Sequence, residues 1–244
     1  MSDKFLGIFA INNNFKPTKK MQILEINLEL VEKLPADEES RLLLPENVAC
    51  KASLTDYLAL NEICEYRIEY HEGFIFSFYH NIYNDFMPNH EQIVSNFMAI
   101  LILFIAKFKL AWRILPSNLV IYIHNDGKPC AYKPDAVVFK GKLNFQTFFR
   151  EDESKFQATD NPYSAIEVLS KGTKSFDLNT KLANYQKIET LEQIIFVEQY
   201  KMAVYVYDKI DGNWIKSEYF DENDQFFVAE CPVSLKELYI YVEF

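Results

Sequence analysis

Glycine is scarce in this chain, with only 6 residues in 244. So few glycines argue against glycine-rich phosphate-binding loops and long flexible linkers. The four cysteines have neither metal-ligand nor redox spacing, so we interpret Cys50, Cys64, Cys130 and Cys231 as free thiols. The N-terminus lacks a basic stretch followed by an apolar core, so no secretory signal is expected. These features predict a cytoplasmic protein.

The chain also lacks an apolar run long enough to cross a bilayer. The longest run extends from Phe97 to Ala106 and ends at Lys107. We interpret it as part of a helix over residues 90–109 that is buried on most of its sides. Its hydrophobic surface exceeds what one small sheet needs. The run therefore predicts a homodimer and no membrane partner.

Basic residues are outnumbered, since 25 Lys and Arg stand against 35 Asp and Glu, for a formal net charge of −10. A chain with this balance repels nucleic acid on average. A nucleic-acid partner therefore requires a local basic patch or bound metal ions. Hydrophobic residues make up 49% of the chain, including 21 Phe and 15 Tyr, which is enough to bury a large core.

The order of the expected elements predicts an α/β (α+β) fold with a mixed sheet flanked by helices. We divide the chain into an N-terminal extension, residues 1–52, and one domain, residues 53–244. The extension is expected to contain a strand over 21–30 and a polar loop over 35–40. In the domain we expect helices over 53–63 (capped by Ser53 or Thr55), 90–109 and 177–190. Two short strands are expected within 67–79, with a turn at Glu72-Gly73, and further strands over 119–124, 134–140, 163–170, 193–198 and 202–207. A long connection over 141–161 and a strand-rich tail over 214–244 complete the domain.

A carboxylate lies in the middle of the apolar strand over 163–170. Because strand side chains alternate between faces, Glu167 shares a face with Ala165 and Leu169. A buried carboxylate is unfavourable unless it is paired or binds a cation. Taken alone, Glu167 is either a salt-bridged or edge-strand residue or a cation ligand.

A second carboxylate, Asp135, begins another apolar strand that the chain enters through Pro134. Carboxylates from neighbouring strands can converge on one point. Mg²⁺ prefers oxygen ligands and usually takes one or two carboxylates plus substrate phosphate. Such an ion activates water and neutralises charge on a phosphoryl group. We therefore expect Asp135 and Glu167 to bind Mg²⁺ or Mn²⁺.

Three further residues are candidates for this site. Lys181 lies at the margin of the buried face of the helix over 177–190. It is either a surface lysine whose ammonium reaches solvent or a cation directed at the acidic site. Glu69 is expected to add a carboxylate, and His90 to contact the metal side or a phosphate at a helix N-terminus. Each of these two is otherwise a satisfied polar residue near the core.

Several of these segments, in this order, resemble the Uma family of restriction endonuclease-like proteins, within the PD-(D/E)XK nuclease superfamily. The similarity covers about residues 53–244. The residues that carry it are Pro134-Asp135; Glu167-Val168-Leu169-Ser170; Asp177 with Lys181 and Tyr185; Ile195-Phe196-Val197; the run from Arg67 to Gly73; and His90 with Ile93 and Asn96.

The resemblance implies a restriction-endonuclease-like core, a Mg²⁺ cofactor and DNA as substrate. The superfamily places a lysine two residues after the glutamate, where this chain has Leu169. Lys181 matches the position of the family's own lysine, and Lys171 is the competing candidate. Asp177 and Tyr185 are secondary candidates by the same resemblance. A non-catalytic binding protein on this fold is the alternative, favoured by the acidic charge and the missing strand lysine.

Overall fold

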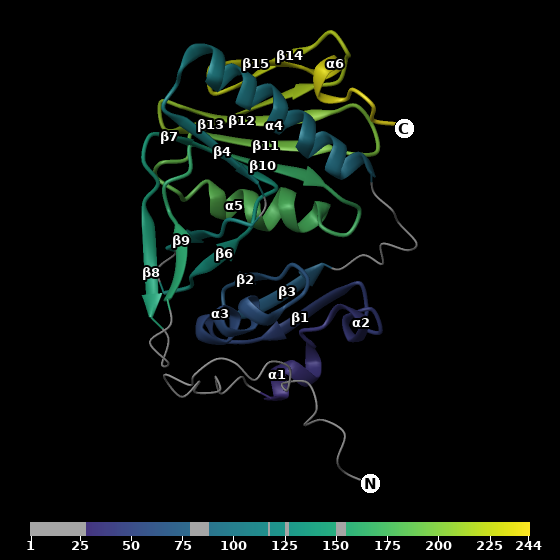
Figure 1. Cartoon of the computed structure of the whole chain (residues 1–244), viewed down its shortest axis with the longest axis vertical. Helices are drawn as coiled ribbons and strands as arrows, with labels where there is room; N and C mark the ends of the chain where they lie inside the picture. The colour runs from purple at the N-terminus through teal and green to yellow at the C-terminus, as the bar shows by residue number, and fades with distance from the viewer. Residues whose placement is uncertain (1–27, 79–87, 117, 125–126, 150–154) are drawn as a thin grey trace, which may run out of the picture.

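The computed structural model describes residues 28–78, 88–116, 118–124, 127–149 and 155–244 (Figure 1). Strands in this part of the chain form two large sheets and a two-stranded ribbon. The six-stranded sheet runs in the order β13 (Asn213–Tyr219), β12 (Val204–Ile210), β11 (Gln193–Glu198), β10 (Ser164–Leu169), β7 (Ala136–Lys140), β4 (Trp112–Pro116). The seven-stranded sheet runs in the order β1 (Asn47–Lys51), β3 (Phe74–Phe78), β2 (Glu69–His71), β6 (Cys130–Tyr132), β5 (Ile121–Ile123), β9 (Lys155–Thr159), β8 (Phe145–Phe149).

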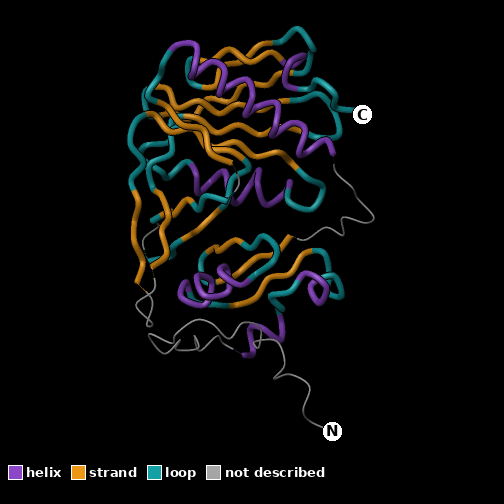
Figure 2. The backbone as a smooth tube through the Cα atoms, viewed as in Figure 1, coloured by secondary structure: helices purple, strands orange, loops and turns teal. Residues whose placement is uncertain are grey.

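The six-stranded sheet is mixed and has helices on both faces, which confirms the predicted fold class. β10 and β11 are parallel, whereas the other neighbouring strands are antiparallel. Figure 2 shows this sheet between a long helix on one side and a shorter one on the other. The long helix is α4 (Pro88–Phe108), and the shorter one joins η1 (Phe176–Lys181) to α5 (Leu182–Tyr185). The ribbon of β14 (Gln225–Val228) and β15 (Cys231–Ser234), with α6 (Leu235–Leu238), shares the core beneath α4.

Helix α4 buries one stripe rather than most of its surface, so the prediction for the run from Phe97 to Ala106 is wrong. Ile93, Phe97 and Leu101 are fully buried, at the spacing of one helical face. Ile102 and Leu103, on the opposite face, are 50% and 70% exposed. The helix crosses a single sheet face, so only that stripe finds partners. Within the described residues, α4 alone has the length and hydropathy of a membrane span, features that it shares with core helices.

The N-terminal region contributes strand β1 to the seven-stranded sheet. It also contains two short helices, α1 (Leu28–Lys33) and α2 (Glu38–Arg41). The predicted strand over 21–30 lies outside the described residues as far as 27, and its last three residues open α1 instead. The predicted loop over 35–40 ends in α2. Leu34 shares a core with Tyr57 and Leu60 of α3 (Leu54–Ile63). The domain boundary after residue 52 stays a prediction.

Two predicted local structures are confirmed. The hydroxyl oxygen of Ser53 accepts a hydrogen bond from the Asp56 backbone N–H at 3.0 Å, and Asp56 Oδ2 accepts one from the Ser53 backbone N–H at 2.8 Å. This capping box starts α3. Strands β2 and β3 form the predicted hairpin, and their turn uses positive φ angles of 46° at Glu72 and 92° at Gly73.

Two predictions over longer segments are wrong. Residues 141–161 contain the antiparallel pair β8–β9 rather than an irregular connection. The segment over 177–190 begins as a π-helix, η1, and its last α-helical turn, α5, ends at Tyr185. The predicted free thiols are confirmed, since Cys50, Cys64, Cys130 and Cys231 make no disulfides.

Candidate active site

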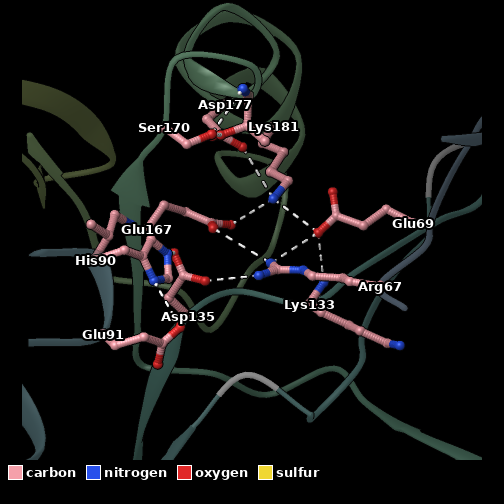
Figure 3. Close-up of polar contacts among 12 residues, drawn as sticks. Arg67, Glu69, His90, Glu91, Lys133, Asp135, Glu167, Ser170, Asp177 and Lys181 are labelled. Carbon is pink, nitrogen blue, oxygen red and sulfur yellow. Dashed lines mark hydrogen bonds and ion pairs between the residues drawn. The ribbon is translucent and has the colours of Figure 1, made fainter. Parts of the chain in front are cut away.

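The strand register brings Asp135 and Glu167 together. Strands β7 and β10 are antiparallel and pair Ala136 with Ile166, so Asp135, just before β7, lies beside Glu167. Ile166 packs in the core on the α4 side of the sheet. Ala165 and Leu169 pack on the α5 side, the side of Glu167. Both predicted strand carboxylates therefore reach one place, where Figure 3 shows them close to Arg67.

Hydrogen-bond donors contact both carboxylate oxygens of Asp135. Its Oδ2 accepts a hydrogen bond from the Val168 backbone N–H at 2.8 Å and lies 3.3 Å from His90 Nε2. Its Oδ1 accepts from Arg67 Nη1 at 2.8 Å. Burial alone raises the pKa of this carboxyl, but the charges of Arg67 and His90 outweigh it and hold the pKa well below its usual range. The Asp135 carboxylate is therefore ionised at neutral pH.

Glu167 is also buried, but its proton affinity is shifted the other way. Its Oε1 accepts a hydrogen bond from the Tyr185 hydroxyl at 2.6 Å and from Lys181 Nζ at 3.0 Å. Burial, together with the nearby carboxylates of Asp177 and Asp135, outweighs the attraction of Lys181 and raises the pKa of Glu167 to about 8. Two neighbouring carboxyls with opposite pKa shifts are typical of catalytic sites.

Lys181 faces the site rather than solvent, since its side chain is only 3% exposed. Its ammonium lies 2.9 Å from Glu69 Oε1 and 3.1 Å from Asp177 Oδ1, in addition to Glu167. Burial lowers the pKa of this lysine, but these three carboxylates together raise it above its ordinary value. Lys181 therefore remains charged and links acids from both large sheets.

The π-helix contributes to the buried position of Lys181, which a helical wheel placed only at the margin of the buried face. A π-helical turn is wider than an α-helical turn, and such turns are frequent at functional sites. In η1 both Asp177 and Lys181 are buried, whereas Leu178 is only partly buried. The competing lysine, Lys171, follows β10 on the surface and does not line the cavity of the site.

Arg67 belongs to the site, although it is not among the predicted site residues. Its guanidinium lies among the acids, with Nη2 at 3.2 Å from Glu69 Oε1 and 3.8 Å from Glu167 Oε2, while Nη1 binds Asp135 (Figure 3). A signal was present in the sequence. Arg67 and Glu69 are two residues apart at the start of a strand, so an acid and a base share one face there.

These residues line a cavity of about 540 Å³. Its wall includes every predicted site residue except Lys171 and the more deeply placed Tyr185. His90, at the first turn of α4, lies on this wall, where Asp135 raises its pKa to about 10 against the opposing effect of burial. The cavity therefore joins acids and bases from β2, the start of β7, β10, η1 and α4.

Comparison with known proteins identifies the family. The Uma2 family, described as "Putative restriction endonuclease", matches residues 54–236. The chain belongs to the Uma2 family. A relative, the uncharacterized protein sll1609 of Synechocystis, is 28% identical over 136 residues, which cover 55% of this chain and 71% of that protein. The resemblance inferred from the sequence is thereby confirmed.

A solved structure shares the fold of this Uma2 chain. It is a putative nuclease of the group DUF820 from Anabaena variabilis. The two superpose with a TM-score of 0.54 and 17% identity, over 73% of this chain and 93% of the other. At this identity the similarity shows the fold alone. The mixed arrangement of sheets and helices in the Uma2 chain is therefore one that a solved protein also adopts.

The donor atoms of the site fit a hard divalent cation, but their present positions do not form a ligand set. Among the described residues, no group of three or more His, Cys, Asp or Glu is placed to hold a metal ion. The guanidinium of Arg67 lies where the acids converge. The buried oxygen Glu69 Oε2 has no hydrogen-bond partner among the described residues. Carboxylate oxygens are the ligands that Mg²⁺ prefers, so the fit requires Arg67 to move.

Proposed function

We propose that this Uma2 protein is a metal-dependent endonuclease that hydrolyses DNA phosphodiester bonds in the cytoplasm, with Mg²⁺ or Mn²⁺ as cofactor. The observation that supports the proposal most is the meeting of Asp135, at the start of one strand, and Glu167, in the adjacent strand, in one cavity with Lys181. Membership of a family described as putative restriction endonucleases supports the class of substrate.

In this proposal Asp135 and Glu167 hold the cation, and Glu69 stands beside them with a free buried oxygen. The bound ion would supply a Lewis acid and an activated water. Asp135 brings a permanent negative charge, since its pKa is held low. His90 and the Val168 backbone N–H fix the orientation of the Asp135 carboxylate. The Tyr185 hydroxyl does the same for Glu167.

Two cations, the buried Lys181 and the partly exposed Arg67, act on the substrate. Lys181 has a charged ammonium at the centre of the acids, where it orients a water molecule and offsets negative charge on the scissile phosphate. Arg67 has a planar guanidinium that matches phosphate as well as carboxylate oxygens. We propose that the Arg67 guanidinium breaks its contacts with Asp135 and Glu167 and binds the incoming phosphate instead. The carboxylate oxygens of Asp135 and Glu167 would then be available to the metal ion. Both residues would stabilise the transition state.

A non-catalytic binding protein on the same fold is the second candidate. It is favoured by the present neutralisation of the acids, since Arg67, Lys181 and His90 already pair with them. Calorimetric titration with Mn²⁺ separates the two candidates. An absence of binding at millimolar Mn²⁺ would favour the binding protein, because an endonuclease of the proposed kind requires the ion.

The direct test is cleavage of supercoiled plasmid and branched DNA with Mg²⁺ or Mn²⁺. We expect Asp135→Asn to abolish cleavage, since the amide removes the charge of the proposed ligand but keeps its shape. Lys171→Met, at the exposed lysine outside the cavity, is the matched control and should cleave like the wild type. Equal residual cleavage by wild type and Asp135→Asn would refute the proposed assignment.

A further inference from the structure

A row of aromatic rings runs along β3, beside the acids. Phe74, Phe76 and Phe78 alternate with Ile75 and Ser77, which are fully buried on the other side of the strand. Phe76 and Phe78 are partly exposed and line the cavity, whereas Phe74, 42% exposed, lies outside it. Partly exposed aromatic rings in the wall of a cavity that also holds many charged side chains favour a ligand with an apolar surface.

The strand register places this row next to the proposed catalytic residues. In the β2–β3 hairpin Glu69 pairs directly with Phe76. Directly opposed residues of antiparallel strands share one face, with Cβ atoms roughly 5 Å apart. Glu69 in turn contacts Lys181 and Arg67. A ligand whose phosphate lies among the acids therefore has its next group beside the Phe76 ring.

The two rings in the cavity wall are held in place from behind. Phe76 and Phe78 are nearly parallel, at 13°, with centroids 6.0 Å apart. Phe176, the first residue of η1, packs against both, at centroid distances of 5.1 Å and 4.9 Å. Phe176 itself does not line the cavity. Two fixed parallel rings form a preorganised stacking surface, which reduces the entropy lost on binding.

We propose that the cavity receives one unpaired nucleotide of DNA, whose base stacks on Phe76 and Phe78 while its phosphate meets the acids. This inference rests on the proposed nuclease function and names its substrate as single-stranded or locally unpaired DNA. A cavity of about 540 Å³ is of the size that encloses a small ligand such as one nucleotide. A base inside a duplex is already stacked and paired, so it cannot occupy such a cavity without leaving the helix.

Stacking also resolves the difficulty posed by the charge of this protein. With a net charge of −10, the chain gains little from general attraction to a DNA backbone. Stacking on an aromatic ring contributes about 1–3 kcal/mol per base, and it does so without a positive charge and with little regard to base identity. An aromatic wall beside a metal site thus provides affinity that a basic patch provides in other nucleic-acid-binding proteins.

Binding of labelled oligonucleotides tests the inference separately from catalysis. Fluorescence anisotropy would compare a single strand, the matching duplex, and the single strand with one abasic position moved along it. We expect the single strand to bind at least about tenfold more tightly than the duplex. Phe76→Leu and Phe78→Leu keep an apolar side chain but remove the ring, so each should weaken single-strand binding about tenfold. Phe74→Leu, in the same row outside the cavity, is the matched control and should bind like the wild type.

The outcomes distinguish the inference from the proposed function. Equal binding of single strand and duplex, unaffected by Phe76→Leu and Phe78→Leu, would overturn the base site even if the protein cleaves DNA. Absence of metal-dependent cleavage of any DNA would overturn the nuclease instead. In that case Phe-dependent binding of the single strand would still support the base site. The abasic position should weaken binding by the wild type but not binding by Phe78→Leu, which has already lost the ring. This comparison is made within each protein, so it supports stacking without relying on the folding of any one variant.

Discussion

Arg67 Nη1 lies 2.8 Å from Asp135 Oδ1, so the carboxylate proposed as a metal ligand already has a cation of the protein beside it. The same guanidinium lies within 4 Å of two other acids, Glu69 and Glu167. Arg67 therefore offsets the repulsion among carboxylates that burial would otherwise make severe. It also opposes any divalent ion that approaches the same oxygens.

Replacing Arg67 should therefore strengthen metal binding. Two unit charges 4 Å apart interact by about 4 kcal/mol at the effective dielectric of a protein surface, so losing the guanidinium should raise Mn²⁺ affinity at least about tenfold. Isothermal titration calorimetry of wild type and Arg67→Met measures this. Lys133→Met is the control, because the Lys133 ammonium binds Asn61 instead of the acids. Unchanged or weaker Mn²⁺ binding by Arg67→Met would show that the metal and Arg67 do not share this site.

Removing Lys181 should destabilise the fold in a pH-dependent way. Lys181→Met leaves Glu69, Glu167 and Asp177 without their shared counter-charge, and removing one partner of a buried pair typically lowers the free energy of unfolding by about 3–5 kcal/mol. Burial raises the pKa of both Glu167 and Asp177, so these acids can become neutral at low pH. We expect a large fall in melting temperature at pH 8 and a smaller one at pH 5.

The two candidate lysines are compared in the same assay. Lys171 is exposed and lies outside the cavity, so Lys171→Met should melt like the wild type at both pH values and keep its nuclease activity. Lys181→Met should lose that activity. A Lys171→Met variant that is inactive but stable would transfer the catalytic role to the lysine that directly follows β10.

The face of Glu167 and the place of Asp135 at the start of a strand were predictable because they depend on local rules. Alternation along β10 fixes the face of Glu167, and Pro134 marks the start of the strand that Asp135 precedes. The antiparallel pairing of β7 and β10 then sets the two acids side by side. The sequence predicted neighbouring strands but not this register, which tertiary packing decides.

The role of Arg67 and the form of η1 depended on contacts that sequence patterns do not encode. Arg67 and Asp135 are 68 residues apart in the sequence. They meet only because the β2–β3 hairpin lies next to the six-stranded sheet. The π-helix differs from an α-helix by a single wider turn, which the apolar pattern of Phe176–Lys181 does not distinguish. The β8–β9 pair was missed because β8 is an edge strand with few buried positions and a weak alternation signal.

The exposed side of α4 bears on the predicted homodimer, which stays a prediction. Ile102 and Leu103 leave a large apolar surface next to the uncharged Ala99 and Ala106. If two chains pair through this face, light scattering should give twice the 28.7 kDa mass of one chain. Leu103→Glu should then halve the mass, whereas Ile210→Glu, at another exposed apolar residue at the end of β12, should not. A wild-type mass of one chain would contradict the homodimer.

Glu167 makes the stability of this protein depend on pH in a direction that can be measured. Its pKa is about 8 in the folded chain and 4.5 in the reference state. The folded state therefore binds this proton more tightly than the unfolded state. The stabilisation is complete below about pH 4.5 and is lost as pH rises towards 8.

Glu167→Gln removes this dependence, because glutamine stays neutral and still accepts the hydrogen bond of the Tyr185 hydroxyl. Each pKa unit corresponds to about 1.4 kcal/mol, so the variant should gain on the order of a few kcal/mol over wild type at pH 8 and much less at pH 5. For a chain of this size that is a rise in melting temperature of roughly 5–10 °C at pH 8. Differential scanning calorimetry at both pH values, in the presence of a chelator, measures the difference. A variant that melts below the wild type at pH 8, or by the same margin at both pH values, would show that Glu167 is held as an anion by Lys181. In that case it would join Asp135 as a permanent negative charge at the site.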